Sequence, residues 1–129
     1  MKTSIKITAL FMIFTVLVNA QGDTQQSMDI KDLQGTWKID LRPTPTSDAY
    51  YQEFMVEKIE DNTIQGSFYG SPIKKGWVNA NWDKVYFAFT TSDATNDYYH
   101  SGYIKNGEVR GISYCPNREF VAPWVGKKE

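Results

Sequence analysis

Apolar and polar residues alternate in short runs from Leu33 onward, and turn-forming residues separate these runs. In Lys84–Thr90, for example, Val85, Phe87 and Phe89 recur at every second position, which places them on one face of an extended strand. No stretch has the period of a convincing amphipathic helix. The pattern therefore predicts a series of β-strands. The expected strands are Thr36–Leu41, Tyr51–Ile59, Thr63–Tyr69, Lys74–Asn79, Lys84–Thr90, Tyr98–Ile104, Glu108–Tyr114 and Glu119–Gly126.

About eight strands at a spacing of roughly ten to twelve residues predict an all-β fold. Short links between consecutive strands favour an antiparallel up-and-down meander closed into a barrel, because closure removes exposed sheet edges. Asn106-Gly107 suits a tight hairpin turn within this meander. Pro123 fits poorly, because proline cannot donate to a β-ladder; it is compatible with a barrel that has one imperfect seam or with a β-sandwich, the alternative fold.

The connections at the two ends of such a meander differ. At one end, named the closed end, they are short: Glu60–Asn62, Ala80–Asp83 and Lys105–Gly107. At the other, the open end, they are longer and chemically richer: Arg42–Tyr50, Gly70–Ile73, Thr91–Asp97 and Cys115–Arg118. Binding residues concentrate on loops held by a rigid scaffold, and barrel ligands enter at the mouth. We therefore expect the functional site at the open end.

The first twenty residues have the features of a secretory signal peptide. Lys2 and Lys6 provide a basic start, Ile7–Val18 is an uncharged apolar run, and small residues precede a cleavage point after Ala20. The apolar run is shorter than the roughly 20 residues that a transmembrane helix needs. An N-terminal core helix or a membrane anchor is the alternative. We expect a secreted or periplasmic protein with a signal peptide in the bacterial style.

Cleavage would leave a chain long enough for one modest core and too short for two. Residues 21–32 are expected to form a flexible leader, in which Met28–Leu33 could form one short helical turn, and residues 33–129 a single β-barrel domain. Removing the first twenty residues leaves 12 basic and 15 acidic residues, a formal charge of −3. This charge argues against a nucleic-acid or anionic-membrane partner. The sequence has no cofactor motif, and no pattern specifies an oligomeric state.

Gly35-Thr36-Trp37 opens the first expected strand, and here the chain resembles the calycin barrels: lipocalins, avidins and fatty-acid-binding proteins. The resemblance covers strand count and rhythm over about 95 residues, and this three-residue motif. It implies that Trp37 plugs the closed end and that a basic residue of the last strand, Lys127 or Lys128, packs over it. It also implies a small barrel that holds a small, mostly apolar molecule.

His100 and Cys115 are the single histidine and cysteine of the chain. His100 shares a strand face with Tyr98; it could act as a pocket donor or a general base, and a hydrogen-bonded wall residue is the favoured interpretation. Cys115 is interpreted as a buried or loop thiol rather than a nucleophile, since no third group orients a Cys–His pair. Thr91–Asp97 is rich in oxygen atoms but lacks the spacing of a calcium loop, so no metal site is expected.

Tyrosines gather near the expected open-end loops: Tyr50, Tyr51, Tyr69, Tyr98, Tyr99 and Tyr114. Each combines a large apolar face with a hydroxyl, which suits either a selective pocket or simple capping of the barrel. Arg118 could bind a carboxylate or phosphate through two parallel hydrogen bonds. The expected ligand-binding residues are Tyr50, Tyr69, Phe89, Tyr98, His100 and Arg118, and no catalytic residue is assigned.

Three functions are compatible with these features. The favoured one is an exported binding protein for a small apolar or amphipathic ligand, which requires a cavity at the open end. The second is a small-barrel enzyme of the isomerase, cyclase or decarboxylase type that uses His100 or a tyrosine as acid or base; a strongly shifted histidine pKa would favour it. The third is an interaction module of the cell envelope with an exposed apolar patch.

Overall fold

The computed structural model describes residues 29–129, and the expected signal peptide lies outside them. The described chain begins with a short 3-10 helix, η1 (Ile30–Leu33), which lies within Met28–Leu33, the segment that could form a helical turn. The strands are β1 (Gly35–Asp40), β2 (Tyr51–Glu60), β3 (Thr63–Phe68), β4 (Ser71–Pro72), β5 (Lys74–Asn79), β6 (Val85–Ser92), β7 (Asp97–Lys105), β8 (Glu108–Cys115) and β9 (Phe120–Lys128). All eight expected strands are present, with ends moved by at most two residues. β4 is an addition, inside the connection expected at Gly70–Ile73.

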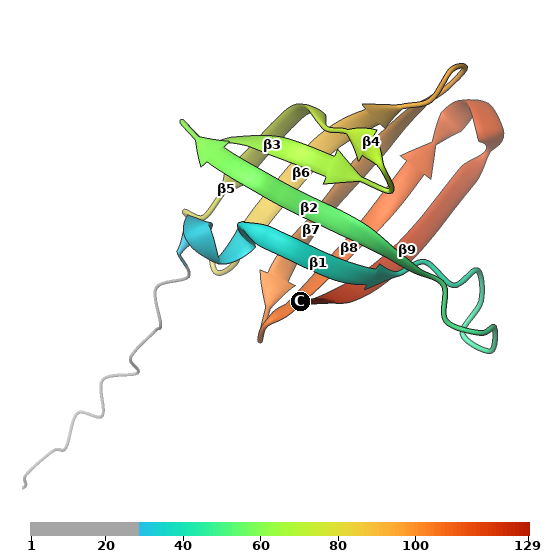
Figure 1. Cartoon of the computed structure of the whole chain (residues 1–129), viewed down its shortest axis with the longest axis horizontal. Coiled ribbons are helices and arrows are strands. Elements are labelled where there is room, and N and C mark those ends of the chain that lie inside the picture. Colours follow the sequence, from blue (N-terminus) through green and yellow to red (C-terminus); the bar gives the residue numbers. More distant parts are fainter. Residues whose placement is uncertain (1–28) are drawn as a thin grey trace, which may run out of the picture.

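Eight of the strands form one closed antiparallel barrel (Figure 1). Consecutive strands pair with each other, and β1 pairs with both β2 and β9, so that the sheet closes on itself. The short strand β4 pairs with β3 beside this ring. The meander barrel is therefore confirmed, and two separate sheets are excluded. No helix within residues 29–129 is long and apolar enough to cross a membrane.

The seam between β1 and β9 is incomplete. β1 pairs with β9 only from Asp40 opposite Val125 to Trp37 opposite Lys128, whereas β8 pairs with β9 along its whole length. Pro123 lies in the part of β9 that has β8 as its sole strand partner, so it disrupts no ladder on the β1 side. The seam is therefore intact toward the closed end and unpaired toward the open end.

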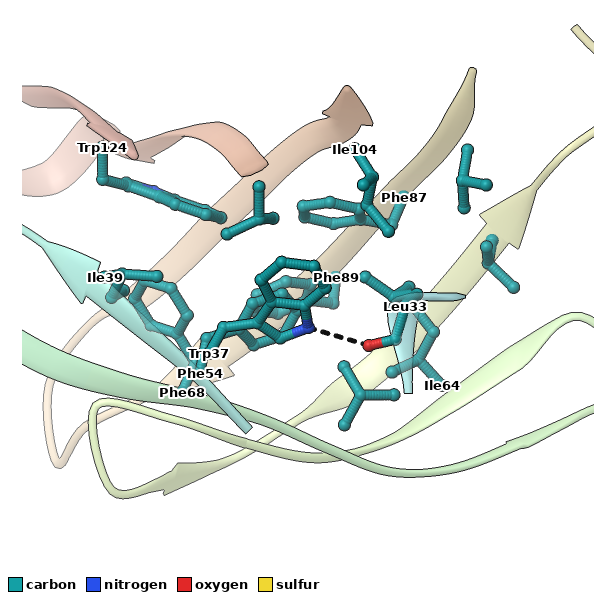
Figure 2. Packing of buried hydrophobic residues seen from close by; sticks show 14 residues of the cluster. Leu33, Trp37, Ile39, Phe54, Ile64, Phe68, Phe87, Phe89, Ile104 and Trp124 are labelled. Atoms are coloured by element: carbon teal, nitrogen blue, oxygen red, sulfur yellow. Dashed lines mark hydrogen bonds between the residues drawn. The ribbon is translucent and has the colours of Figure 1, made fainter. Parts of the chain in front are cut away.

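The closed end is filled by an apolar core that includes Leu33 and Trp37, both almost completely buried. Figure 2 shows the indole N–H of Trp37 pointing to the carbonyl oxygen of Leu33, to which it donates a 2.8 Å hydrogen bond. Nζ of Lys128 lies 5.0 Å from the centre of the Trp37 ring and donates to the carbonyl oxygen of Asp32 at 2.7 Å. Lys128 thus occupies the place that the resemblance implied for Lys127 or Lys128. Together these contacts tie η1 over the end of the barrel.

Candidate functional site

A cavity of about 1080 Å³ lies at the open end of the barrel. All four open-end connections contribute to its wall, through residues such as Arg42, Ser71, Asp93 and Arg118. The strands β6 to β9 contribute inward-pointing residues to the inner part of the wall, and β8 and β9 also contribute exposed residues such as Arg110 and Val125. The cavity thus lies at the end of the barrel that has the longer connections.

The cavity also opens sideways through the incomplete seam. Leu41 and Pro43 line it on the β1 side, and Pro123 and Val125 line it on the β9 side. These two segments face each other where the pairing between β1 and β9 has ended. The cavity is therefore open both at the mouth and at the side of the barrel.

The inner end of the cavity contains a chain of four hydrogen-bonded side chains. Nε2 of His100 lies 2.8 Å from the hydroxyl of Thr91, and Nδ1 lies 2.7 Å from the hydroxyl of Ser113. The indole N–H of Trp124 donates to the same Ser113 oxygen at 2.9 Å. Gly111 makes room for this indole, because a Cβ atom there would lie 2.2 Å from it. All four side chains line the cavity and are nearly inaccessible to bulk solvent.

His100 is held in its neutral form by its surroundings. Its ring lies 4.3 Å from the ring centre of Phe68 and 4.7 Å from that of Phe89. Burial lowers the pKa of His100 from 6.5 to about 4, because the charged imidazolium would lose its hydration there. At neutral pH the inner end of the cavity is therefore polar but uncharged.

The rim of the cavity carries a second hydrogen-bonded chain. Arg118 donates to the hydroxyl of Tyr98 at 2.8 Å, and Tyr98 donates to the carboxylate of Asp93 at 2.9 Å. Asp93 also accepts the backbone N–H groups of Thr95 and Asn96, which fixes the β6–β7 turn and lowers the Asp93 pKa. Most N–H donors of the Arg118 guanidinium have no partner among residues 29–129 and are exposed.

The opposite side of the rim is formed by two further pairs. The hydroxyls of Tyr50 and Tyr69 are hydrogen-bonded, with ring centres 6.1 Å apart. Asp40 pairs with Arg42, and this hydrogen bond lowers the pKa of Asp40 to about 2. Arg42 is thus neutralised within the protein, whereas Arg118 contacts a phenol.

Five of the six predicted site residues line this cavity: Tyr50, Tyr69, Tyr98, His100 and Arg118. Phe89 does not line it; it is buried behind His100 and packs on Phe54 with ring centres 5.1 Å apart. Among the other tyrosines considered, Tyr51, Tyr99 and Tyr114 point away from the barrel interior and are about half exposed. The cavity therefore uses only the tyrosines on its inner side and in its loops.

Sequence reasoning missed the polar residues at the inner end. The sequence pattern places Thr91 in the Thr91–Asp97 connection, but in the structure it lies in β6, in step with Val85, Phe87 and Phe89. Ser113 points inward from β8, opposite His100 in the register of β7 and β8. Extending the expected strand Lys84–Thr90 by one residue places the Thr91 hydroxyl inside.

Cys115 is buried, and within residues 29–129 no group of three His, Cys, Asp or Glu side chains could hold a metal ion. A shallower hollow of about 310 Å³ lies on the outer face of β5 to β8. Its wall includes Trp77, which is 60% exposed, together with Tyr99 and Tyr114. The molecule thus has a deep inner cavity and a separate aromatic outer surface.

No protein-family model, curated protein or solved structure matches this chain. Its function is therefore inferred from the cavity, its charges and its hydrogen bonds.

Proposed function

We propose that this protein is a non-catalytic binding protein that holds a small amphipathic ligand in the open-end cavity. The observation that carries the proposal is the cavity of about 1080 Å³, lined by aromatic side chains and a few polar groups. Ligand pockets in proteins have volumes of about 300–1000 Å³ and a similar mixture of apolar wall and placed polar groups. A fully packed open end would have been incompatible with this function.

The charges of the wall support an anionic head group on the ligand. Of the three arginines at the cavity, Arg42 pairs with Asp40 and Arg110 pairs with Glu108. Arg118 contacts no carboxylate within the salt-bridge distance among residues 29–129, and its donors are exposed at the rim. A carboxylate or phosphate can bind such a guanidinium through two parallel hydrogen bonds. The apolar part of the ligand would then occupy the aromatic interior.

A role outside the cytoplasm is part of the proposal. The expected cleavage after Ala20 would release residues 21–129 to the periplasm or the medium. Membership in the calycin barrels is proposed on the closed meander, Trp37 at the plugged end and Lys128 packed over its ring. Holding a small apolar molecule is the usual role of that class.

A fluorescent amphiphile tests the proposal. We expect 11-(dansylamino)undecanoate to bind with a blue shift in its emission, since the dansyl group would enter an apolar space. Ala122→Phe places a ring inside the cavity beside Ser113 and should weaken binding at least tenfold. Ala88→Phe places the same ring in the outer hollow and should leave affinity unchanged. Thermal unfolding of both variants checks that they are folded.

Two other results of this titration would contradict the proposal. Saturable binding that survives Ala122→Phe and is lost in Ala88→Phe would place the ligand on the outer aromatic surface around Trp77 and favour an interaction module. The absence of saturable binding to the unmodified barrel would remove the support for a ligand carrier.

The enzyme alternative is favoured by one observation, the strongly lowered pKa of His100 inside the cavity. A base with a pKa of about 4 is weak at neutral pH, and both ring nitrogens already bond Thr91 and Ser113. NMR titration of His100 with bound amphiphile separates the two functions. A pKa that stays far below neutrality supports binding, and a pKa moved to near 7 supports acid–base catalysis.

A further inference from the structure

The hydrogen-bond chain at the inner end of the cavity has a fixed direction at one terminus. The indole nitrogen of Trp124 can only donate, so the Ser113 oxygen accepts its hydrogen. Neutral His100 has one N–H and one acceptor nitrogen, and it bonds Ser113 on one side and Thr91 on the other. The positions of the remaining hydrogens follow from these two constraints.

The four side chains hold four hydrogens that can be donated, but they form only three hydrogen bonds with one another. One hydroxyl hydrogen therefore has no acceptor within the chain. In a head-to-tail arrangement, Trp124 donates to Ser113, Ser113 to Nδ1 of His100, and Nε2–H to Thr91, and each bond strengthens the next. In the alternative tautomer, Nδ1–H of His100 donates to Ser113 and Thr91 donates to Nε2. The Ser113 oxygen then accepts two hydrogen bonds, and the bonds no longer run in one direction. On this ground we assign the spare hydrogen to the hydroxyl of Thr91.

The surroundings of the spare hydroxyl hydrogen indicate which kind of ligand atom could accept it. Thr91 is 96% buried and lines the cavity, and no other hydrogen bond of residues 29–129 gives its hydroxyl a second partner. A buried donor without an acceptor costs free energy, so a ligand oxygen there is favoured over hydrocarbon. The hydroxyl of Thr91 bonds neutral His100, whose ring packs on Phe68, and both residues line the cavity together with Trp124. A carboxylate would lose its hydration there without a cation, so the acceptor is neutral.

We propose that the ligand carries a neutral hydrogen-bond acceptor, such as a ketone or ester oxygen, where it meets the inward-facing hydroxyl of Thr91, which donates to it. This inference rests on the proposed binding function. It makes the ligand an amphiphile with two polar points, a charged head at the Arg118 rim and an uncharged oxygen in the interior. The chain from Trp124 to Thr91 then acts as a specificity device, which rejects pure hydrocarbon tails.

A matched pair of neutral naphthalenes tests the acceptor. The ketone 6-propionyl-2-(dimethylamino)naphthalene and its carbonyl-free analogue 2-(dimethylamino)-6-propylnaphthalene differ mainly in one oxygen atom. We expect the ketone to bind about fivefold more tightly, the size of one net hydrogen bond. Thr91→Val should abolish this preference and shift the emission of the bound ketone to the blue, while affinity for the carbonyl-free probe stays unchanged. Thr91→Ser retains the hydroxyl and should retain the preference.

The outcomes distinguish this inference from the binding function. Equal affinity of the two naphthalenes for the unmodified protein, or a preference that survives Thr91→Val, overturns the assignment of the acceptor while binding of dansylaminoundecanoate still stands. If the dansyl amphiphile binds but neither naphthalene does, the assignment of the acceptor is also overturned. If none of the three probes binds, the proposed function fails and this inference fails with it.

Discussion

The closed and open ends of this barrel are built from the same eight strands but are filled in different ways. At the closed end, Leu33 and Trp37 are almost inaccessible and η1 covers them. At the open end, the same interior contains a cavity, a buried histidine and hydroxyls in place of further apolar side chains. From this difference we infer that the closed end contributes most of the stability and that the open end is available for the proposed ligand.

The turns at the two ends differ in how readily their residues adopt positive φ angles. At the closed end, positive φ angles fall on residue types that tolerate them, namely Asn62, Asn106 and Gly107. At the open end they fall on Tyr69, Gly70 and Glu119, and of these three only the glycine readily adopts such angles. Tyr69 lies at the cavity rim, and Glu119 follows Arg118. Two residues with unfavourable φ angles therefore lie at or next to the rim of the open-end cavity.

The largest expected effect contrasts a closed-end and an open-end aromatic residue. Trp37→Ala should lower the free energy of unfolding by about 3–5 kcal/mol, because it removes a fully buried ring and leaves a cavity. Tyr50→Ala, at the open rim, should lower it by less than about 1 kcal/mol, because Tyr50 is 44% exposed. Urea denaturation of both variants measures the difference. Equal losses would contradict the assignment of stability to the closed end.

The next effect concerns acid. The pKa of His100 is about 4 in the folded protein and 6.5 in an unfolded chain, so between these values the unfolded state binds the extra proton. Stability should be complete above pH 6.5 and fall by about 3 kcal/mol as the pH drops to 4. Asp40, with a pKa of about 2, stays ionised over this range. His100→Gln should remove this part of the pH dependence, measured by urea denaturation across the range. A slope that is unchanged in the variant would count against a buried neutral histidine.

The charge at the rim gives a smaller effect, confined to ligand binding. Arg118→Gln should weaken dansylaminoundecanoate about tenfold, as expected for a hydrogen bond between charged groups, and leave its neutral methyl ester unchanged. Arg110→Gln is the matched control, because Arg110 already pairs with Glu108. Fluorescence titration at two salt concentrations measures both. A similar loss for Arg110→Gln, or for the methyl ester, would contradict a specific head-group site.

The smallest effect tests the strain at the open end. Tyr69 and Gly70 form a two-residue turn between β3 and β4, both with positive φ. Tyr69→Asn should raise the free energy of unfolding by up to about 1 kcal/mol, because asparagine adopts this conformation more readily. It should also weaken probe binding, because the rim loses its bond with Tyr50. Reduced stability in this variant would contradict the prediction that the backbone at Tyr69 is strained.

The alternation of side chains was sufficient to predict the strands, the closed meander and the two unlike ends. It was also sufficient to place Tyr98 and His100 on one inner face, because strand periodicity fixes the direction of each side chain. It could not show that Phe89 is covered by His100, or that Ser113 and Trp124 meet across the β8–β9 pair. Such contacts depend on register and barrel curvature, which arise from pairings distant in sequence.

The four tryptophans provide the most direct test of an open-end binding site. In a ¹⁵N–¹H correlation spectrum, each indole N–H gives a separate signal: Trp37 reports on the closed end, Trp124 on the cavity, and Trp77 and Trp82 on the exposed surface. On addition of dansylaminoundecanoate we expect the Trp124 signal to move and the Trp37 signal to stay in place. Movement of the Trp77 signal with Trp124 unchanged would contradict a ligand inside the barrel.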